Sequence, residues 1–236
     1  MADLIESARA ILSLSERRVE ATANNVANLT TPGFKSERLY SETSPETDLH
    51  APETSQLKRL DLAQGRLSKT NNPLDLAISG PGMFQFRGVD GLPVYSRSGQ
   101  FKLGDDGRVV NAQGLALQTA DGGDLILSTD AIKVLADGTV MEGERPVARI
   151  GLYRPTSGGQ FLSIGGSLFR APGDGVEEVA APDLRQAMIE NSNVVLGDEM
   201  VTMMEALRTA EGGARLVQNY DELMGRAIST FGQGAR

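Results

Sequence analysis

The N-terminal part of the chain places its apolar positions with the period of an α-helix. Apolar or small side chains recur in steps of 4-3-4-4-3-4, at Leu4, Ala8, Ile11, Ser15, Val19, Thr22 and Val26. This eleven-residue repeat marks one face of a nearly straight or slightly right-handed helix. Charged residues such as Glu6, Arg17 and Glu20 lie largely off that face. The pattern predicts a helix from Leu4 to about Val26.

The C-terminal segment has a second helical pattern. Its apolar positions follow a 4-3 heptad that is interrupted at Asp221: Leu196, Met200, Met203, Leu207, Ala210, Ala214, Val217, Met224, Ile228 and Phe231. A second apolar line from Met204 to Ala227 widens this face beyond a two-stranded seam. Gly212 and Gly213 lie in mid-helix, where each costs about 1 kcal/mol relative to Ala. The sequence therefore predicts a long helix that frays alone and needs more than one neighbour.

The middle of the chain has the period of β-structure. Asp-Gly pairs recur about every 15 or 16 residues, at Asp90-Gly91, Asp106-Gly107, Asp121-Gly122 and Asp137-Gly138. The β-favouring runs around them are Met83–Arg87, Leu92–Ser96, Gln100–Leu103, Arg108–Val110, Leu125–Leu127, Ile132–Leu135 and Val147–Tyr153. Asp-Gly between apolar runs is a strong hairpin signal, and many short strands favour an antiparallel sheet or barrel. The polar stretch before this region, residues 37–72, is expected to be a loop or an extended connector.

Composition narrows the classes of function. The 236 residues carry a net charge of −8 without a basic stripe, which argues against a nucleic-acid partner. No apolar run approaches the roughly 18 residues of a membrane span, and the acidic N-terminus does not resemble a cleaved signal peptide. There is no cysteine and one histidine, His50, so thiol chemistry and an ordinary zinc site are not expected. We find no catalytic constellation, and we expect neither enzymatic activity nor a cofactor.

One motif raises a question that composition does not answer. The stretch ANNVANLTTPGFKS, residues 23–36, places Asn24, Asn25 and Asn28 at the end of the first helix. Pro32-Gly33 suits the central positions of a type II turn, with a positive φ at Gly33, so the second half ends the helix. The amides either cap the helix or meet a neighbouring molecule, because neutral amides can donate and accept without the desolvation cost of charge.

Four segments in order resemble the flagellar rod and hook axial proteins, and they span nearly the whole chain. They are ANNVANLTTPGFKS, QGRLSKTNNPLDLAISGPGMFQF, VYSRSGQFKLGDDGRVVNAQGLAL and SNVVLGDEMVTMMEALRTAEGGARLV. Within this family, the length and the modest β region are most similar to the proximal-rod members, with the distal-rod paralogue as the alternative.

The resemblance implies an α+β fold with a discontinuous, coiled-coil-like helical domain built from both termini. An antiparallel all-β domain would lie between the two helices. The expected boundaries are residues 1–36 for the first helix and its turn, 37–73 for the connector, 74–180 for the β domain and 181–236 for the last helix.

The same resemblance implies a structural subunit of the basal-body rod, assembled into a helical tube that transmits motor torque. Its partners would be copies of itself, other rod proteins and the flagellar type III export apparatus, with no cleaved signal. The expected assembly interface is Leu4, Ile11, Asn24, Asn25, Asn28, Leu196, Met200, Met203, Leu207, Val217, Met224 and Ile228. The rival class is a surface-binding β module whose terminal helices form a closed coiled coil.

Overall fold

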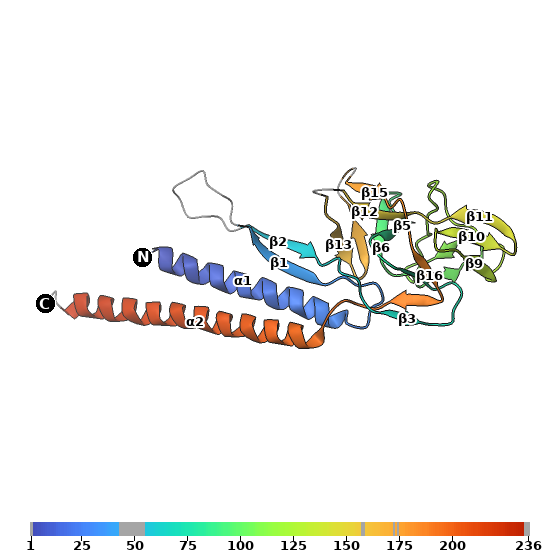
Figure 1. The fold of residues 1–236 in the computed structure, drawn as a ribbon. Coiled ribbons are helices and arrows are strands. Elements are labelled where there is room, and N and C mark those ends of the chain that lie inside the picture. Colours follow the sequence, from blue (N-terminus) through green and yellow to red (C-terminus); the bar gives the residue numbers. More distant parts are fainter. Residues whose placement is uncertain (1, 43–54, 157–158, 172, 174, 234–236) are drawn as a thin grey trace. The chain divides into compact units, whose positions relative to one another are not determined.

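The computed structural model describes residues 2–42, 55–156, 159–171, 173 and 175–233 (Figure 1). The elements in chain order are α1 (Ala2–Ala27), β1 (Glu37–Glu42), β2 (Ser55–Leu60), β3 (Leu67–Lys69), β4 (Leu76–Ile78), β5 (Met83–Arg87), β6 (Pro93–Ser96), β7 (Lys102–Leu103), β8 (Val109–Val110), β9 (Ile132–Val134), β10 (Thr139–Glu142), β11 (Arg145–Arg149), β12 (Leu152–Pro155), β13 (Leu162–Gly165), β14 (Leu168–Arg170), β15 (Val176–Glu178), β16 (Leu184–Gln186), β17 (Met188–Glu190) and α2 (Leu196–Gln233). An α+β fold with a helix at each end and an antiparallel middle is confirmed.

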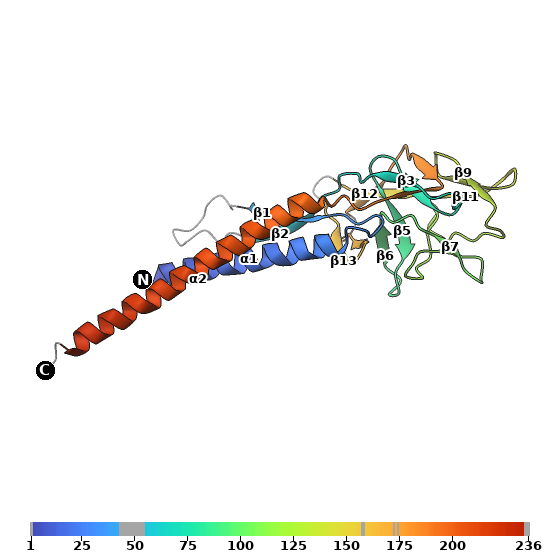
Figure 2. The same cartoon turned by 90° about the horizontal axis from the view of Figure 1, so that it is seen from below.

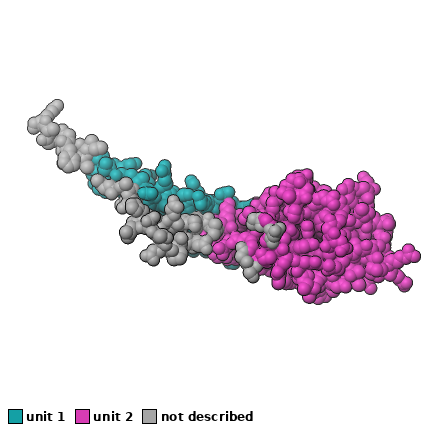
Figure 3. Space-filling view, turned by 90° about the horizontal axis from the view of Figure 1, so that it is seen from above, with its two compact units in different colours: residues 1–26, 195–236 teal, residues 27–194 magenta. Residues whose placement is uncertain are grey.

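The chain divides into two compact units (Figure 3). The helical unit comprises residues 1–26 and 195–236, and the β unit comprises residues 27–194. These boundaries differ from the expected ones, because residues 27–36 and 181–194 belong to the β unit. The reason is hydrogen bonding: the Gly33 amide donates to the Glu190 carbonyl oxygen at 2.8 Å, and strands β16 and β17 pair with β4 and β3.

In the helical unit, α1 and α2 lie side by side and antiparallel, and α2 extends beyond the start of α1 (Figures 1 and 2). The predicted stripe of α1 is confirmed, since Ala8, Ser15 and Thr22 are buried. Both helices are held close by small residues. A Cβ atom at Gly213 would lie 3.2 Å from Cγ2 of Ile11 and 3.3 Å from Cδ2 of Leu12.

The strand pairs described in the β unit are antiparallel. Its largest sheet has six strands in the order β13-β14-β6-β5-β12-β15, and a second sheet has the order β11-β10-β9. The main core includes Phe84, Phe86 and Phe101, with the Phe84 and Phe101 rings edge to face at a centroid distance of 5.2 Å. A smaller apolar cluster contains Phe161 and Phe169.

The Asp-Gly signals mark turns as predicted. At each pair the glycine has a positive φ, between 76° and 88°. In the first turn, the Gly91 amide donates to the Gly88 carbonyl oxygen at 3.0 Å, and the Gly88 amide donates to the Leu92 carbonyl oxygen at 2.9 Å. The predicted strands agree closely at β5 and β6. Leu125–Leu127 forms only an isolated bridge, between Ile126 and Arg108.

The segment expected to be a connector contains three strands. Strands β1 and β2 form an antiparallel hairpin, with Glu37 opposite Leu60 and Glu42 opposite Ser55. Strand β3 pairs with β17. The polar composition concealed β1 and β2, in which Arg38, Tyr40 and Lys58 are exposed, because an antiparallel pair with a solvated face needs few apolar residues. His50 and the SPETDLHAPE stretch lie outside the described residues.

Candidate assembly surface

Large apolar side chains of α2 remain exposed in the single chain. Met200 is 56% exposed and Leu207 is 49% exposed. Both belong to the predicted interface, and a contact between subunits requires such exposure in the single chain. Leu196 and Met224 are also exposed. Several large apolar side chains exposed along one helix favour an interaction site more than a single exposed side chain does. We call the set Leu196, Met200, Leu207 and Met224 the α2 apolar face.

The remaining apolar candidates are placed differently. Ile11, Met203 and Val217 are half-buried within the single chain, and Gly213 approaches the Ile11 side chain. The side chains of Leu4 and Ile228 lie outside the described residues. Sequence reasoning missed Val201, which is 50% exposed and lies on neither apolar line of α2.

The three asparagines at the end of α1 are not equivalent. Asn24 and Asn28 are half-buried, whereas Asn25 is 2% exposed, so its amide is covered before any neighbouring copy arrives. The Thr31 hydroxyl donates to the Asn28 side-chain oxygen at 3.1 Å, and the Thr31 amide donates to the Asn28 carbonyl oxygen at 3.1 Å. Asn28 therefore takes part in ending the helix, as the capping alternative expects.

The turn after α1 requires glycine. Gly33 has a φ of 69°, and the Phe34 amide donates to the Thr31 carbonyl oxygen at 3.3 Å, which confirms the predicted turn. A Cβ atom at Gly33 would lie 2.1 Å from the Ser98 backbone nitrogen. This close approach carries Phe34 and Lys35 into the β unit, where both are buried.

Lys35 enters a buried cluster of three charged side chains, which we call the clasp: Lys35, Arg97 and Glu190. The Lys35 Nζ donates to Glu190 Oε1 at 2.7 Å, and the Arg97 Nε donates to Glu190 Oε2 at 2.5 Å. The Glu190 side chain is fully buried, and its Oε1 also accepts from the Gly65 amide at 2.8 Å. The Lys35–Glu190 contact therefore joins residues that are 155 positions apart.

Backbone carbonyl groups satisfy the rest of the clasp. The Arg97 guanidinium donates to the carbonyl oxygens of Ile78, Gly80 and Gly82. The Lys35 Nζ donates to the carbonyl oxygen of Ala63 at 2.6 Å. Buried charges are tolerated only when they are paired and hydrogen-bonded, and this cluster meets that requirement.

Asn193 adds a neutral bridge beside the clasp. Its side-chain oxygen accepts from the Ser36 amide at 2.8 Å, and its amide nitrogen donates to the Asp61 carbonyl oxygen at 2.8 Å. The two points at which the chain enters and leaves the β unit are thus tied together.

The clasp does not resemble a catalytic site. Burial is the largest influence on Lys35 and lowers its pKa, while the charge and hydrogen bond of Glu190 act in the opposite direction. Within the described part of the chain, no three His, Cys, Asp or Glu side chains gather to hold a metal ion. Nor does any described helix have the length and apolar character needed to cross a membrane.

Comparison with known proteins decides the family. Three family models match: "Flagella basal body rod protein" over residues 7–35, "Flagellar hook protein FlgE/F/G D1 domain" over residues 77–142 and "Flagellar basal body rod FlgEFG protein C-terminal" over residues 185–230. Flagellar basal-body rod protein FlgF of Caulobacter vibrioides is 30% identical over 228 residues, which cover 92% of this chain and 93% of that protein. The chain belongs to the flagellar basal-body rod protein family.

Two further relatives refine this assignment. FlgF of Mesorhizobium japonicum is 31% identical and covers 92% of each chain. FlgG of Buchnera aphidicola subsp. Baizongia pistaciae is 28% identical, covering 90% of this chain and 94% of its own. This rod-family chain is most like FlgF, as the sequence indicated.

The three clasp residues are distributed over the three family matches. Lys35, Arg97 and Glu190 each fall in a different matched segment. The α2 apolar face falls within the C-terminal match, residues 185–230. In this rod-family protein, the clasp therefore joins one residue from each matched segment, and all three residues lie in the β unit.

Proposed function

We propose that the protein builds the flagellar rod through its terminal helices, which pack with those of neighbouring subunits into a helical tube that transmits motor torque. As a member of the basal-body rod family, it is a structural subunit of the flagellar basal body. The role we propose is structural and involves no cofactor.

The α2 apolar face supports this proposal most directly. Burying a side chain such as Met or Leu is worth roughly 1.5–3 kcal/mol, so several such residues can offset the ordering of frayed helix ends. Within the chain, α1 and α2 approach each other through small residues, which leaves larger side chains on the outside. Copies that meet through different surfaces form an open helical filament when the rotation between them does not close into a ring.

The proposal extends to packing and partners. We propose that the helices pack in a coiled-coil-like manner, with Asn24 and Asn28 at contacts between subunits. The partners are copies of this chain, other rod proteins and the flagellar type III export apparatus, which would take the chain without a cleaved signal. Its position along the rod would follow from its place in an intact basal body imaged by electron cryo-microscopy.

The test replaces two exposed residues of the α2 apolar face, Met200→Asp and Leu207→Asp, in one variant. Because both side chains are about half exposed, the single chain should fold while rod assembly fails. Assembly is scored by motility and by rods in isolated basal bodies. The matched control adds the same charge at two exposed polar positions of α2, Gln218→Asp and Asn219→Asp.

The rival class, a surface-binding β module with a closed coiled coil, predicts that the helix variant assembles normally. A closed helical pair would protect its amides against hydrogen exchange in the dilute monomer, and the Met200→Asp, Leu207→Asp variant would assemble as well as its control. Normal rods in that variant would exclude the α2 apolar face from assembly. We expect weak protection of α2 in the monomer instead.

A further inference from the structure

The last twelve residues of the β unit, residues 183–194, bond to parts of the unit that lie far from them in the sequence. Strand β16 pairs with β4, and β17 pairs with β3. The Leu184 amide donates to the Ala136 carbonyl oxygen at 2.9 Å, and the Asn191 amide donates to the Arg66 carbonyl oxygen at 2.9 Å. We call residues 183–194 the closing strap.

The closing strap supplies the charge that completes the clasp. Lys35 and Arg97 are buried, and among the described residues each forms its ion pair with Glu190. A buried charge without a partner is strongly unfavourable, because neither water nor a counter-ion compensates it. Burial of Lys35 and Arg97 therefore becomes favourable only when the strap brings Glu190.

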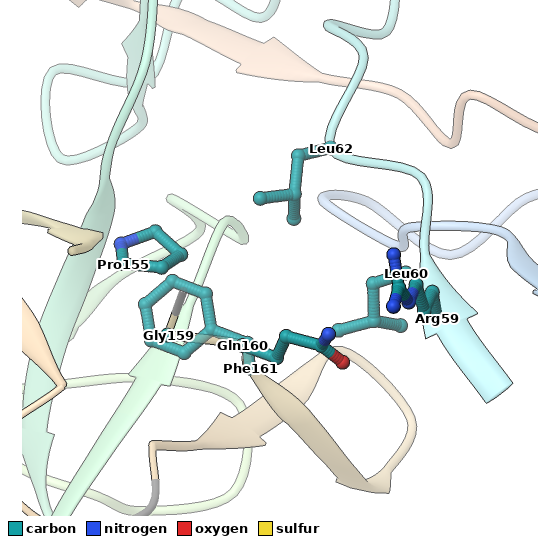
Figure 4. A pocket seen from close by; sticks show the side chains of 7 residues that line it. All are labelled: Arg59, Leu60, Leu62, Pro155, Gly159, Gln160 and Phe161. Carbon is teal, nitrogen blue, oxygen red and sulfur yellow. The ribbon is translucent and has the colours of Figure 1, made fainter. Parts of the chain in front are cut away.

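The segment that follows β2 also depends on the strap. The Asn193 side-chain nitrogen donates to the Asp61 carbonyl oxygen at 2.8 Å, and the Gly65 amide donates to Glu190 Oε1 at 2.8 Å. Beside this segment lies a cavity of about 310 Å³, whose lining includes four apolar side chains: Leu60, Leu62, Pro155 and Phe161 (Figure 4). Because this side is open, the hydrogen bonds to the strap are important for holding the segment in place.

The strap holds Ala187 in a conformation that residues with a Cβ atom rarely adopt. Ala187 lies between β16 and β17 with a φ of 57°. The neighbouring Gln186 side chain accepts from the Val134 amide at 3.1 Å and donates to the Ile132 carbonyl oxygen at 2.9 Å. The Thr70 amide donates to the Ala187 carbonyl oxygen at 3.0 Å. Such a backbone conformation persists only where its surroundings fix it, so β3 and β9 have to be in place before the strap takes this bend.

The separation of contacts along the chain indicates the same order. The Glu190 carboxylate meets Lys35, Gly65 and Arg97 across 155, 125 and 93 positions. Strands β5 and β6, in contrast, are joined by the short turn at Asp90-Gly91. Closing a longer loop costs more chain entropy, so contacts between distant residues form late.

From these observations we propose that the closing strap docks last and that its docking completes the β unit. Until residues 183–194 are present, Lys35 and Arg97 stay in water and the unit stays open. Docking also places the exit of the unit beside its entry, because the Gly33 amide donates to the Glu190 carbonyl oxygen. A chain made from its N-terminus therefore cannot complete the β unit early, which is a conformational control beyond the proposed role in assembly.

The order of folding is measured on the full natural chain. The protein is unfolded in urea, diluted into buffer and pulse-labelled with deuterium at increasing times, and its peptides are then analysed by mass spectrometry. We expect peptides of β5 and β6 to gain protection in an early phase, and those of the strap and β3 in a later one. Protection of the strap together with β5 and β6, or before them, would overturn the proposal.

A disulfide that holds the strap in place provides an independent test, because the natural chain has no cysteine. Lys69 and Met188 lie opposite each other in the β3–β17 ladder, which suits a disulfide in a Lys69→Cys, Met188→Cys variant. When the oxidised variant is unfolded and refolded, its late phase should be about tenfold faster than in the reduced form, because the longest loop is already closed. An unchanged late phase would contradict late docking.

The matched control places the disulfide in a ladder outside the strap. Arg154 and Glu177 lie opposite each other in the β12–β15 ladder, and both are largely exposed. Oxidation of an Arg154→Cys, Glu177→Cys variant should leave the late phase at its reduced rate. Equal acceleration in the two variants would show that the strap is not the late step.

These measurements use dilute single chains, so their outcome does not depend on rod assembly. If the strap docks early while Met200→Asp, Leu207→Asp blocks assembly, the strap proposal is wrong and the helical proposal stands. If the helix variant assembles normally, the helical proposal is wrong, whatever the order of folding.

Discussion

In the β unit, the three charged side chains of the clasp are buried and each is satisfied by partners from the same unit, whereas in the helical unit large apolar side chains remain in solvent. The two patterns are opposite. A buried, paired charge is stable only where the surrounding structure is complete. An exposed apolar side chain lowers the free energy only when another surface covers it. The difference suggests that the β unit completes itself and that the helical unit is completed by its neighbours.

The two units also use glycine and small residues differently. In the β unit, glycines at positive φ close the Asp-Gly turns and the turn at Gly33. In the helical unit, Gly213 has an ordinary helical backbone, and what it supplies is space for Ile11 and Leu12. One role is conformational and can be expected from the local sequence. The other is steric and depends on a partner helix.

The largest effect is expected when the β unit loses its central carboxylate. Glu190→Gln leaves Lys35 and Arg97 buried without a counter-charge, and breaking a buried pair costs about 3–5 kcal/mol. Urea denaturation followed by the β-sheet signal should show this loss. The control is Glu177→Gln, which breaks the largely exposed pair with Arg154 and should cost at most about 1 kcal/mol. Equal losses in the two variants would show that the clasp does not stabilise the unit.

The next effect tests close packing in the helical unit. Gly213→Leu places a large side chain against Ile11 and Leu12, and overpacking of this kind costs about 1–3 kcal/mol. Thermal loss of the helical circular dichroism signal should move to lower temperature, while the β-sheet transition stays where it was. A shift of both transitions would mean that the two units do not unfold separately.

A neighbouring glycine should respond in the opposite direction. Apart from its chain neighbours and the adjacent backbone of its own helix, no atom lies within 4 Å of a Cβ atom at Gly212, so Gly212→Ala adds helix propensity without a clash. The helical unit should gain up to about 1 kcal/mol. The same thermal measurement compares it with Gly213→Leu. A loss of stability in Gly212→Ala would indicate that flexibility at this point is needed within the single chain.

The sequence predicted those features whose cause is local. The periods of the two terminal segments located α1 and α2, because a helix repeats every few residues and buries one face. The Asp-Gly pairs located turns, because Asp bonds the backbone two residues ahead and Gly accepts a positive φ. Strands such as β13 were missed, since its four residues are all exposed and carry no alternation.

The clasp and the helix contact could not be predicted in this way. Lys35 and Glu190 are 155 residues apart, and nothing near either residue in the sequence marks it as buried. From the sequence alone, Gly213 only lowers the helix propensity of α2. Its steric role depends on the approach of Ile11. Both features depend on which distant segments meet, and that information is absent from any single window of the chain. The α2 apolar face could be predicted as apolar, but its exposure follows only from what α1 leaves uncovered.

The smallest effect is expected from the turn carboxylates of the β unit. The pKa values of Asp90, Asp106 and Asp137 lie below the usual range, chiefly because the backbone amide two residues ahead donates to each carboxylate. A carboxyl group with a lowered folded-state pKa stabilises the fold above its unfolded pKa of about 3.9, and this stability is lost as the pH falls through the folded value.

Asn at all three positions keeps a hydrogen-bond acceptor for the turn and removes the titration. Urea denaturation from neutral to acidic pH should therefore show a flatter loss of β-unit stability in the triple Asn variant than in the natural protein. Because these carboxylates are exposed, each contribution is small and should weaken further at high salt. An identical pH dependence in the two proteins would assign the acid response to other groups. A flatter one would show that the turns predicted from the sequence stabilise the β unit separately from the clasp.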